Sequence, residues 1–163
     1  MSIVIVVAAM IAVAGLVVCI ERAALRQYAE LVAETNGALR QLAHGTDLPI
    51  FESSPPPDAR PAFATVRGTY RGRHVSVSVA YVATDEIATS LFVSAASRRP
   101  DFDVSSLEST ADEVSDNGKG ITLIFAPRKT FWQFGFLTYD TLPEKDTVRL
   151  RAALDRACDA LGP

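Results

Sequence analysis

The chain is poor in the residues that build covalent or metal-held frameworks. It has two cysteines, Cys19 and Cys158, and two histidines, His44 and His74, among 163 residues. The cysteines lie near opposite ends of the sequence, so we expect no disulfide framework, which suits a reducing compartment. Neither histidine has a second histidine or a cysteine at ligand spacing, which argues against a zinc site. We therefore expect no metal and no cofactor.

Positive charge is also scarce. The chain has 16 Lys and Arg against 19 Asp and Glu, which gives a net charge of −3. A mildly acidic chain lacks the strong field that gathers nucleic acid, so we expect no nucleic-acid partner. Several basic residues form small groups: Arg67, Arg71 and Arg73; Arg98 and Arg99; Arg128 and Lys129.

No stretch has the specificity of a catalytic motif. Residues 116–120, Asp-Asn-Gly-Lys-Gly, lack the full spacing of a phosphate-binding loop and run into a predicted strand, so we expect a hairpin turn there. Asp101 and Asp103 lie in a predicted loop, and His74 occupies the polar phase of a predicted strand. Cys158 adjoins the apolar face of the last predicted helix, where a thiol is usually inert. We therefore expect a non-catalytic protein.

The first 20 residues carry no charged side chain. An apolar helix over residues 2–20 matches the length that spans a hydrocarbon core of about 30 Å. A secretory signal would carry basic residues before the apolar run and would end it near a cleavage site. Here the run continues beyond Ala14, and Val18 stands where a lipoprotein signal needs a small residue before Cys19. These features predict a retained, single-pass membrane anchor.

The charges beside the anchor predict its orientation. Arg22 and Arg26 follow the apolar run, with Arg40 further along, whereas the N-terminal side has only the α-amino group. Basic flanks favour the cytoplasmic side. We therefore expect the N-terminus outside and the rest of the chain in the cytoplasm.

Small residues recur along one side of the predicted anchor. Ala8, Ala12, Gly15 and Cys19 are spaced so that they share one helix face. Such a face lets another transmembrane helix approach closely, and the partner is either a different protein or a second copy of this chain. The alternative is that these residues only reflect the general abundance of alanine and glycine in membrane helices.

Residues 21–45 continue as a predicted amphipathic helix. Asn36-Gly37 weakens its middle, and Gly45 is a plausible C-cap. We favour a helix that lies on its own domain or on a partner over a free coiled coil, because the apolar seam is short. That seam comprises Leu25, Tyr28, Val32, Thr35, Leu39 and Leu42.

A proline-rich linker is predicted over residues 46–61, between the helical part over 1–45 and a small domain over 62–163. The domain begins with a hairpin whose strands flank a turn at Arg71-Gly72. Further strands are predicted over 87–95, 121–126 and 130–139, with a short helix or irregular strand between 104 and 114. The last helix is expected from Pro143 onward. Its buried face comprises Leu150, Leu154, Ala157 and Leu161.

This order of elements predicts an α+β fold, in which the C-terminal helix packs on one face of an antiparallel sheet of about five strands. On the predicted strand over 130–139, Trp132, Phe134 and Phe136 share a face beside Arg128 and Lys129. These aromatic residues either form core under the last helix, which we favour, or form a patch that faces a protein partner. In the second case the basic pair faces anionic headgroups or an acidic protein surface.

Two functions are compatible with this sequence. The first is a non-catalytic accessory subunit that docks in the bilayer on a larger complex, for example an energy-transducing one, and stabilises or helps to assemble it. The second is a membrane-tethered cytoplasmic domain that binds a ligand or acts as an enzyme through His74 or the acidic loop. We favour the first, because the chemical groups do not assemble into a site by sequence.

Overall fold

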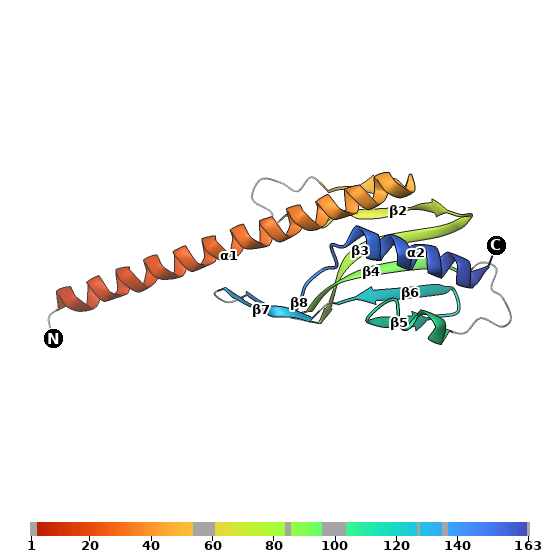
Figure 1. The fold of residues 1–163 in the computed structure, drawn as a ribbon. Helices are drawn as coiled ribbons and strands as arrows, with labels where there is room; N and C mark the ends of the chain where they lie inside the picture. The colour runs from red at the N-terminus through yellow and green to blue at the C-terminus, as the bar shows by residue number, and fades with distance from the viewer. Residues whose placement is uncertain are drawn as a thin grey trace.

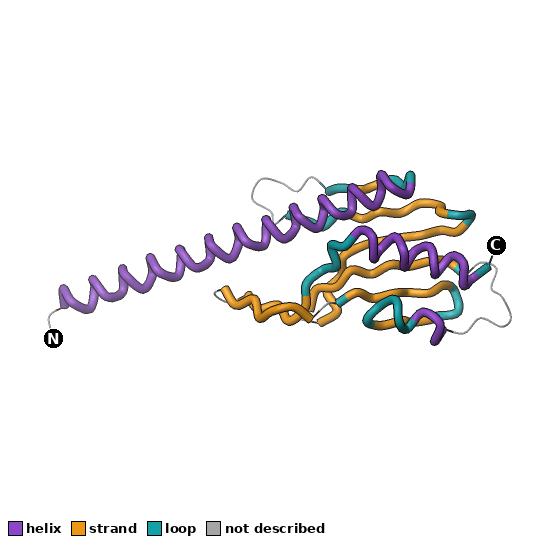
Figure 2. Tube along the Cα trace, viewed as in Figure 1, coloured by secondary structure: helices purple, strands orange, loops and turns teal. Residues whose placement is uncertain are grey.

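A computed structural model of the chain describes residues 3–53, 61–83, 86–95, 104–126, 128–134 and 137–162. It contains a long N-terminal helix, an antiparallel sheet and a C-terminal helix, as the sequence predicted for an α+β fold (Figure 1). Both helices pack on the same face of the sheet (Figure 2), because their apolar residues join one core with the inward-facing strand residues.

Helix α1, Ile3–Thr46, is continuous over 44 residues and about 66 Å long. With Gly45 as its C-cap the helix would have ended at His44, so it is two residues longer than expected. Asp47 takes the left-handed conformation, with φ 54°, and Leu48 N–H donates to the carbonyl of Ala43 at 3.0 Å. This is the hydrogen bond of a Schellman-type C-cap, in which Asp47 takes the place usually held by glycine.

Asn36-Gly37 does not interrupt α1, contrary to the weakening expected there. The Asn36 side chain donates to the carbonyl of Ala62 at 3.1 Å and accepts from the N–H of Ala64 at 2.7 Å. The amide therefore ties the start of the domain to the middle of the helix, which repays the lower helix propensity of asparagine.

Part of the predicted linker belongs to the folded domain. Leu48 is buried in the core, and the short strand β1, Ile50–Phe51, pairs antiparallel with the next strand. Residues 54–60, which include three of the prolines, lie outside the described residues. The predicted spacer is therefore wrong for residues 48–51, which pack or pair within the domain.

The sheet follows the order β1-β2-β3-β4-β6-β5 along its antiparallel path. Its strands are β2 Thr65–Tyr70, β3 Arg73–Ala83, β4 Glu86–Ser94, β5 Glu113–Asp116 and β6 Gly120–Phe125. A short 3-10 helix, η1 Val104–Leu107, precedes β5. These elements confirm the strands predicted in this part of the chain.

Two predicted turns are also confirmed. Arg71 and Gly72 connect β2 and β3 with φ angles of 47° and 77°, the positive values that a two-residue type I′ turn requires. At the β5–β6 turn Gly118 has φ 75°, and the side chain of Asn117 accepts from the N–H groups of Lys119 and Gly120, both at 3.0 Å.

The single strand expected over 130–139 is wrong. The chain instead forms two strands, β7 Arg128–Phe134 and β8 Leu137–Thr141, which pair antiparallel with each other. Thr141 of β8 pairs in parallel with Glu86, the first residue of the inner strand β4. From there the hairpin runs away from the main sheet, along α1 and toward its N-terminal half (Figure 1).

Helix α2, Thr147–Leu161, begins later than Pro143. Its N-cap is Asp146, whose carboxylate accepts from the N–H groups of Val148 at 2.9 Å and Arg149 at 3.2 Å, so this side chain sets the start of the helix. The predicted buried face is confirmed, since Leu150, Leu154, Ala157 and Leu161 are all at most 1% exposed.

Most of the core lies between the two helices and the inner face of the sheet. The buried residues of the strands in this core include Val66, Val75, Val77, Leu91, Val93, Ile121, Leu123 and Phe125. The outer face carries small polar residues that are only partly covered, among them Ser76, Ser78, Ser90 and Thr122. A sheet covered on one side has this alternation of apolar and polar residues.

One position on the outer face depends on glycine. A Cβ added at Gly120 would lie 2.5 Å from the carbonyl oxygen of Val93 and would also overlap the Phe92 ring. We expect Gly120→Ala to lower the free energy of unfolding by roughly 2 kcal/mol, because the overlap involves backbone that cannot rotate away. Urea unfolding monitored by circular dichroism measures this change.

The matched control for this prediction is Gly37→Ala in α1. A Cβ there would meet nothing within 4 Å. Alanine should therefore raise stability by up to about 1 kcal/mol through helix propensity alone. Equal effects of the two substitutions would contradict the close approach at Gly120.

Candidate membrane anchor and docking surfaces

The N-terminal half of α1 projects away from the domain (Figure 2). Every side chain described from Ile3 to Cys19 is exposed, including Met10 at 67% and Leu16 at 61%. Among the described residues, α1 is the one helix that is both long enough and apolar enough to cross a membrane. Signal sequences and core helices of soluble proteins meet the same criterion, so length and composition alone are weak evidence of a span.

The predicted small-residue face is uncovered by the described part of the chain. Ala8, Ala12, Gly15 and Cys19 are exposed on one side of α1, and a Cβ added at Gly15 would meet nothing within 4 Å. A second helix therefore has room to approach along this face.

The predicted juxtamembrane seam lies mostly against the chain's own domain. Tyr28, Val32, Thr35, Leu39 and Leu42 are buried, whereas Leu25 is 45% exposed. The Tyr28 ring packs edge-on against Phe63, and Leu39 and Leu42 belong to the main core. The buried part of the seam thus serves the fold and is not free to receive a partner.

Two ion pairs add to this attachment of α1. Arg40 on the helix pairs with Glu52 beyond β1, and Glu34 pairs with Lys145 near the start of α2. The hydrogen bonds from Arg40 lower the pKa of the Glu52 carboxyl. Both pairs are exposed, so each contributes little to stability but favours one orientation of helix and domain.

Four residues of the predicted aromatic and basic patch lie on one strand. Arg128, Lys129, Trp132 and Phe134 lie on β7, and Phe136 lies outside the described residues. Arg128 stands at the sheet end of the hairpin and Phe134 at its free end. The basic and aromatic residues are therefore separated along the hairpin.

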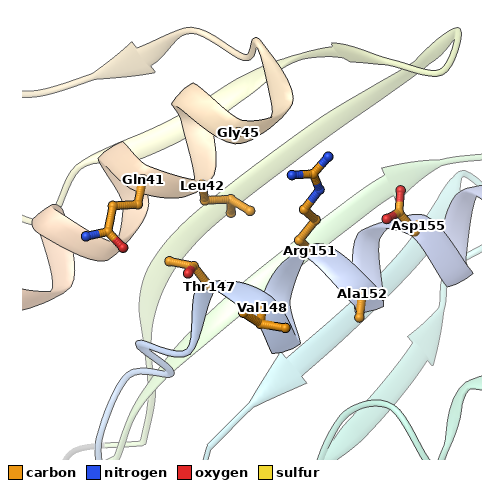
Figure 3. A pocket seen from close by; sticks show the side chains of 8 residues that line it. All are labelled: Gln41, Leu42, Gly45, Thr147, Val148, Arg151, Ala152 and Asp155. Carbon is orange, nitrogen blue, oxygen red and sulfur yellow. The ribbon is translucent and has the colours of Figure 1, made fainter.

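A cavity of about 420 Å³ lies between the C-terminal end of α1 and the first turns of α2 (Figure 3). Arg151 reaches from α2 toward the end of α1, and a Cβ on Gly45 would lie 3.4 Å from its Nη1. Asp155 in the same cavity accepts from the hydroxyl of Tyr70 at 2.8 Å and pairs with Arg71 at 3.0 Å. Burial and this hydrogen bond raise the pKa of Tyr70. Asp155 thus joins α2 to the end of β2 and to the turn that follows it. Sequence reasoning missed the cavity because its walls lie far apart in the chain.

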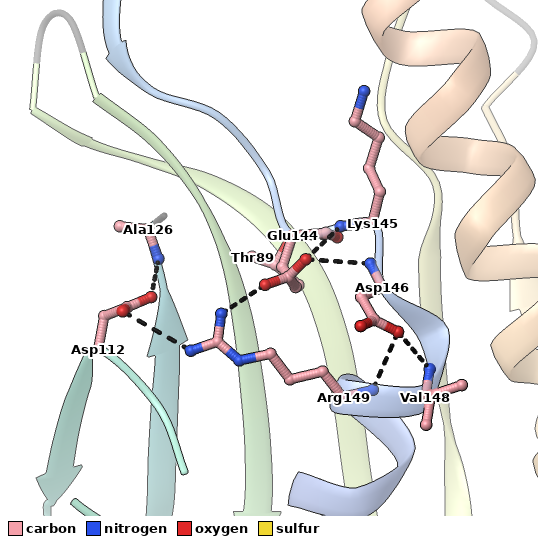
Figure 4. Close-up of polar contacts among 8 residues, drawn as sticks. All are labelled: Thr89, Asp112, Ala126, Glu144, Lys145, Asp146, Val148 and Arg149. Atoms are coloured by element: carbon pink, nitrogen blue, oxygen red, sulfur yellow. Dashed lines mark hydrogen bonds and ion pairs between the residues drawn. The ribbon is translucent and has the colours of Figure 1, made fainter. Parts of the chain in front are cut away.

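A polar network fixes the start of α2 (Figure 4). Arg149 pairs with Glu144 at 2.6 Å and with Asp112 at 3.7 Å, and its guanidinium lies 5.2 Å from the Phe125 ring centroid. Asp112 also accepts from the N–H of Ala126 at 2.9 Å. Glu144 and Asp112 are therefore both paired with Arg149. This arrangement favours a role in holding the start of α2 in place over acid–base chemistry.

His74 lies in a shallow depression of about 440 Å³ on the outer face of the sheet. Arg67, Ser76 and Phe92 also line this depression, and its lining includes no carboxylate. Asp101 and Asp103 lie outside the described residues, so the acidic loop is not brought to His74 by the described part of the chain. His44 is exposed near the end of α1.

The remaining candidate groups are separate from one another. Cys158 is buried in the main core, and its burial raises the pKa of the thiol, so it stays protonated and unreactive at neutral pH. Cys19 lies on the exposed half of α1. Across the described ranges, no group of three His, Cys, Asp or Glu residues is placed to hold a metal ion.

Arg73 is a buried structural residue. Sequence reasoning missed this role because it counted Arg73 with Arg67 and Arg71 as one of a group of basic residues. Arg73 is 6% exposed, and its guanidinium donates to the carbonyls of Leu161 at 3.0 Å, Gly162 at 2.6 Å and Ser94 at 3.1 Å. The first two carbonyls belong to the C-terminal end of α2, where a positive charge is favourable. Arg73 therefore fastens the last turn of α2 to the sheet.

No family model, curated protein or solved structure matches this chain.

Proposed function

We propose that this protein is a non-catalytic, single-pass membrane subunit that docks on a larger membrane complex and stabilises it or helps to assemble it. The observation that carries the proposal is the division of α1. Its first half is uncharged, apolar and exposed, and its second half is packed into the core of the domain without a break in the helix.

The absence of a joint within α1 supports a positioning role. Residues 3–20 rise about 27 Å, enough to cross most of a hydrocarbon core. The first buried residue of α1, Ala24, lies only about 6 Å further along the axis than Ile20. An anchored chain would therefore hold its domain against the bilayer surface in one orientation, as a subunit that fits a fixed partner must.

The proposed orientation places the domain in the cytoplasm. Arg22 and Arg26 directly follow the apolar run and are exposed, as basic residues at the cytoplasmic headgroups would be. All charged side chains of the chain follow Ile20, which suits an aqueous compartment for this part.

The proposed partner surface within the bilayer is the small-residue face. Helix association in lipid depends on close packing, because lipid tails already satisfy apolar side chains. On the side formed by Ala8, Ala12, Gly15 and Cys19, a second backbone can come close. A transmembrane helix of another subunit is the expected occupant.

Adding bulk to this face should release the protein from its complex. We expect Ala12→Leu with Gly15→Leu to abolish co-migration of the tagged full chain with its partners on a size column after mild detergent extraction, because helix packing depends on the small side chains. Mass spectrometry of the co-migrating proteins measures the effect.

The matched control is Ala9→Leu with Ala14→Leu, which adds similar bulk to the same half-helix away from the small-residue face. This variant should keep the complex. If the wild-type chain migrates as a monomer, or if both variants retain the same partners, the docking proposal fails.

The depression around His74 supports a second candidate, a membrane-tethered domain that binds a ligand or acts as an enzyme. Arg67, His74 and Phe92 combine a positive group, a titratable ring and an aromatic surface there. A function at this site would be lost with Arg67→Ala and His74→Ala but unaffected by bulk on the small-residue face.

A further inference from the structure

The outer face of the sheet is covered by neither α1 nor α2, which both pack on the inner face (Figure 2). The register places its side chains in rows that cross β2, β3, β4, β6 and β5 in that order. One row contains Arg67, Ser76, Phe92, Thr122 and Ser115. The next row contains Ser78, Ser90, Ile124 and Glu113. None of these side chains is buried, so the two rows form an open surface.

β4 is the middle strand of this open surface. Ala88, two residues before Ser90 on the same side of β4, is 0% exposed, so the open surface begins at Ser90. Phe92 stands at the centre of its row, and its ring extends over Gly120 of β6. Phe92 also borders the depression that holds His74. Protein interfaces concentrate their binding energy in aromatic side chains near the centre of the contact, which is the place that Phe92 occupies.

The two ends of the open surface carry opposite charges. On β2 the exposed Arg67 has its guanidinium carbon 4.3 Å from the Phe51 ring centroid, and on β5 Glu113 is exposed. Neither charge forms an ion pair with any residue that the structure describes. Of the nearby turn residues, Arg71 pairs with carboxylates of α2, and Lys119 lies past the end of both rows. A surface with one basic and one acidic end is complementary to a second copy of itself.

The charges select one way of stacking two copies face to face. A two-fold axis across the strands would bring the basic end of one copy against the basic end of the other. A two-fold axis along β4 instead brings β2 of each copy against β5 of the other. Arg67 then faces Ser115 of the second copy, and Glu113 lies two residues further along β5, about 7 Å away and within reach of a guanidinium. Stacked sheets of this kind lie about 10 Å apart.

The direction of α1 selects the same axis independently. α1 runs in the general direction of the strands (Figure 1). An axis along the strands therefore lets the apolar halves of both α1 helices leave the pair at the same end. An axis across the strands would point them in opposite directions. Two anchored chains must enter one membrane from the same side, and the arrangement favoured by charge meets this condition.

We infer that the outer face of the sheet binds a second copy of this chain, in a two-fold dimer whose axis runs along β4. Arg67 of each copy pairs with Glu113 of the other, and the two Phe92 rings meet near the axis. The rows are only about 19 Å wide, over four strand spacings, so the contact is small and the dimer weak and reversible. This contact goes beyond the proposed docking on a larger complex and leaves the small-residue face free for it.

A cysteine placed at the axis tests the dimer. Cys19→Ser first removes the exposed native thiol, and Cys158 is buried. In this background Ser90→Cys puts a thiol on β4, where the two copies meet. Ser115→Cys makes the same substitution on β5, where the two thiols would lie about 19 Å apart. We expect a bifunctional maleimide too short for that distance to cross-link the full-length Ser90→Cys protein in membranes, and to leave the Ser115→Cys protein monomeric.

Charge reversal then tests the pairing. In the Ser90→Cys protein, Arg67→Glu alone and Glu113→Arg alone should each slow cross-linking by roughly tenfold, because each puts like charges opposite one another at both ends of the contact. The two reversals together should restore the rate. A variant that had merely misfolded would not recover in this way, and neither would a surface that held a small ligand.

Three results would overturn the dimer. The first is a Ser90→Cys protein that stays monomeric, whether its outer face is bare or is occupied by a ligand or a different protein. The second is equal cross-linking at Ser90→Cys and Ser115→Cys, which would contradict an axis along β4. The third is a double reversal that cross-links no faster than the single reversals. None of these results bears on the small-residue face, so the proposed docking in the bilayer is tested separately.

Discussion

Arg73→Met will lower the free energy of unfolding by roughly 3–5 kcal/mol, because it removes a buried charge that several carbonyl groups share. The methionine fills much of the space but donates no hydrogen bond. The carbonyls of Leu161, Gly162 and Ser94 then lose the donors that the guanidinium supplies in this structure. Urea unfolding of the full chain in detergent micelles, followed by near-ultraviolet circular dichroism, measures the loss.

Arg71→Met is the matched control, since it removes a neighbouring arginine that is exposed. Arg71 pairs with Asp155 at 3.0 Å and Asp159 at 2.8 Å, and its side chain is 47% exposed. Exposed pairs of this kind contribute little to stability, so the urea midpoint should change little. The loss of stability in Arg73→Lys should fall between those of the two methionine variants. A single ammonium group cannot reach all the carbonyls that the forked guanidinium contacts. Equal urea midpoints for Arg73→Met and Arg71→Met would refute the role of Arg73 at the end of α2.

The contrast between these two arginines explains where prediction from the sequence ends. Arg71 lies in a turn, and Arg71-Gly72 was predicted correctly because a local dipeptide determines the backbone there. Arg73 stands only two residues later on a strand. Its burial depends on the end of α2, 88 residues further along the chain. No local pattern marks such a contact.

Periodicity was a better guide to the buried side of a helix or strand than to the residue at which it ends. The apolar face of α2 is confirmed in full, but the start of the helix depends on the capping carboxylate of Asp146. β7 and β8 were merged into one strand because apolar residues continue from one into the other without a polar break.

Asn36 shows the opposite error, in which a local rule overstated its effect. The low helix propensity of Gly37 beside it predicted a weak point, whereas the Asn36 side chain holds the backbone of Ala62 and Ala64. The seam around it was predicted to lie on its own domain or on a partner. The first of these alternatives describes Tyr28, Val32, Leu39 and Leu42. Only the tertiary fold decides whether a domain or a partner covers such a seam.

Met10→Lys with Val13→Lys will leave the protein in the soluble fraction, whereas the proposed anchor should hold the wild-type chain in the membrane fraction. Both residues are exposed, near the middle of the apolar half of α1 and off the small-residue face. Each lysine at the centre of a spanning helix costs about 2.5–3.5 kcal/mol, so the pair removes much of the advantage of insertion. Alkaline extraction of membranes, followed by detection of the tagged C-terminus, measures the shift.

Met10→Leu with Val13→Leu is the control, because it keeps the segment apolar, and it should remain in the membrane. The lysine variant should keep the near-ultraviolet circular dichroism of the domain, since Met10 and Val13 are exposed and neither belongs to the described core. The intact mass of the wild-type protein completes the test. A mature chain that lacks the apolar segment would identify it as a signal sequence, and a wild-type chain that alkali extracts would exclude an anchor. Retention of the full mass in the alkali-resistant fraction is the result expected of a subunit whose domain is fastened to the bilayer by one unbroken helix.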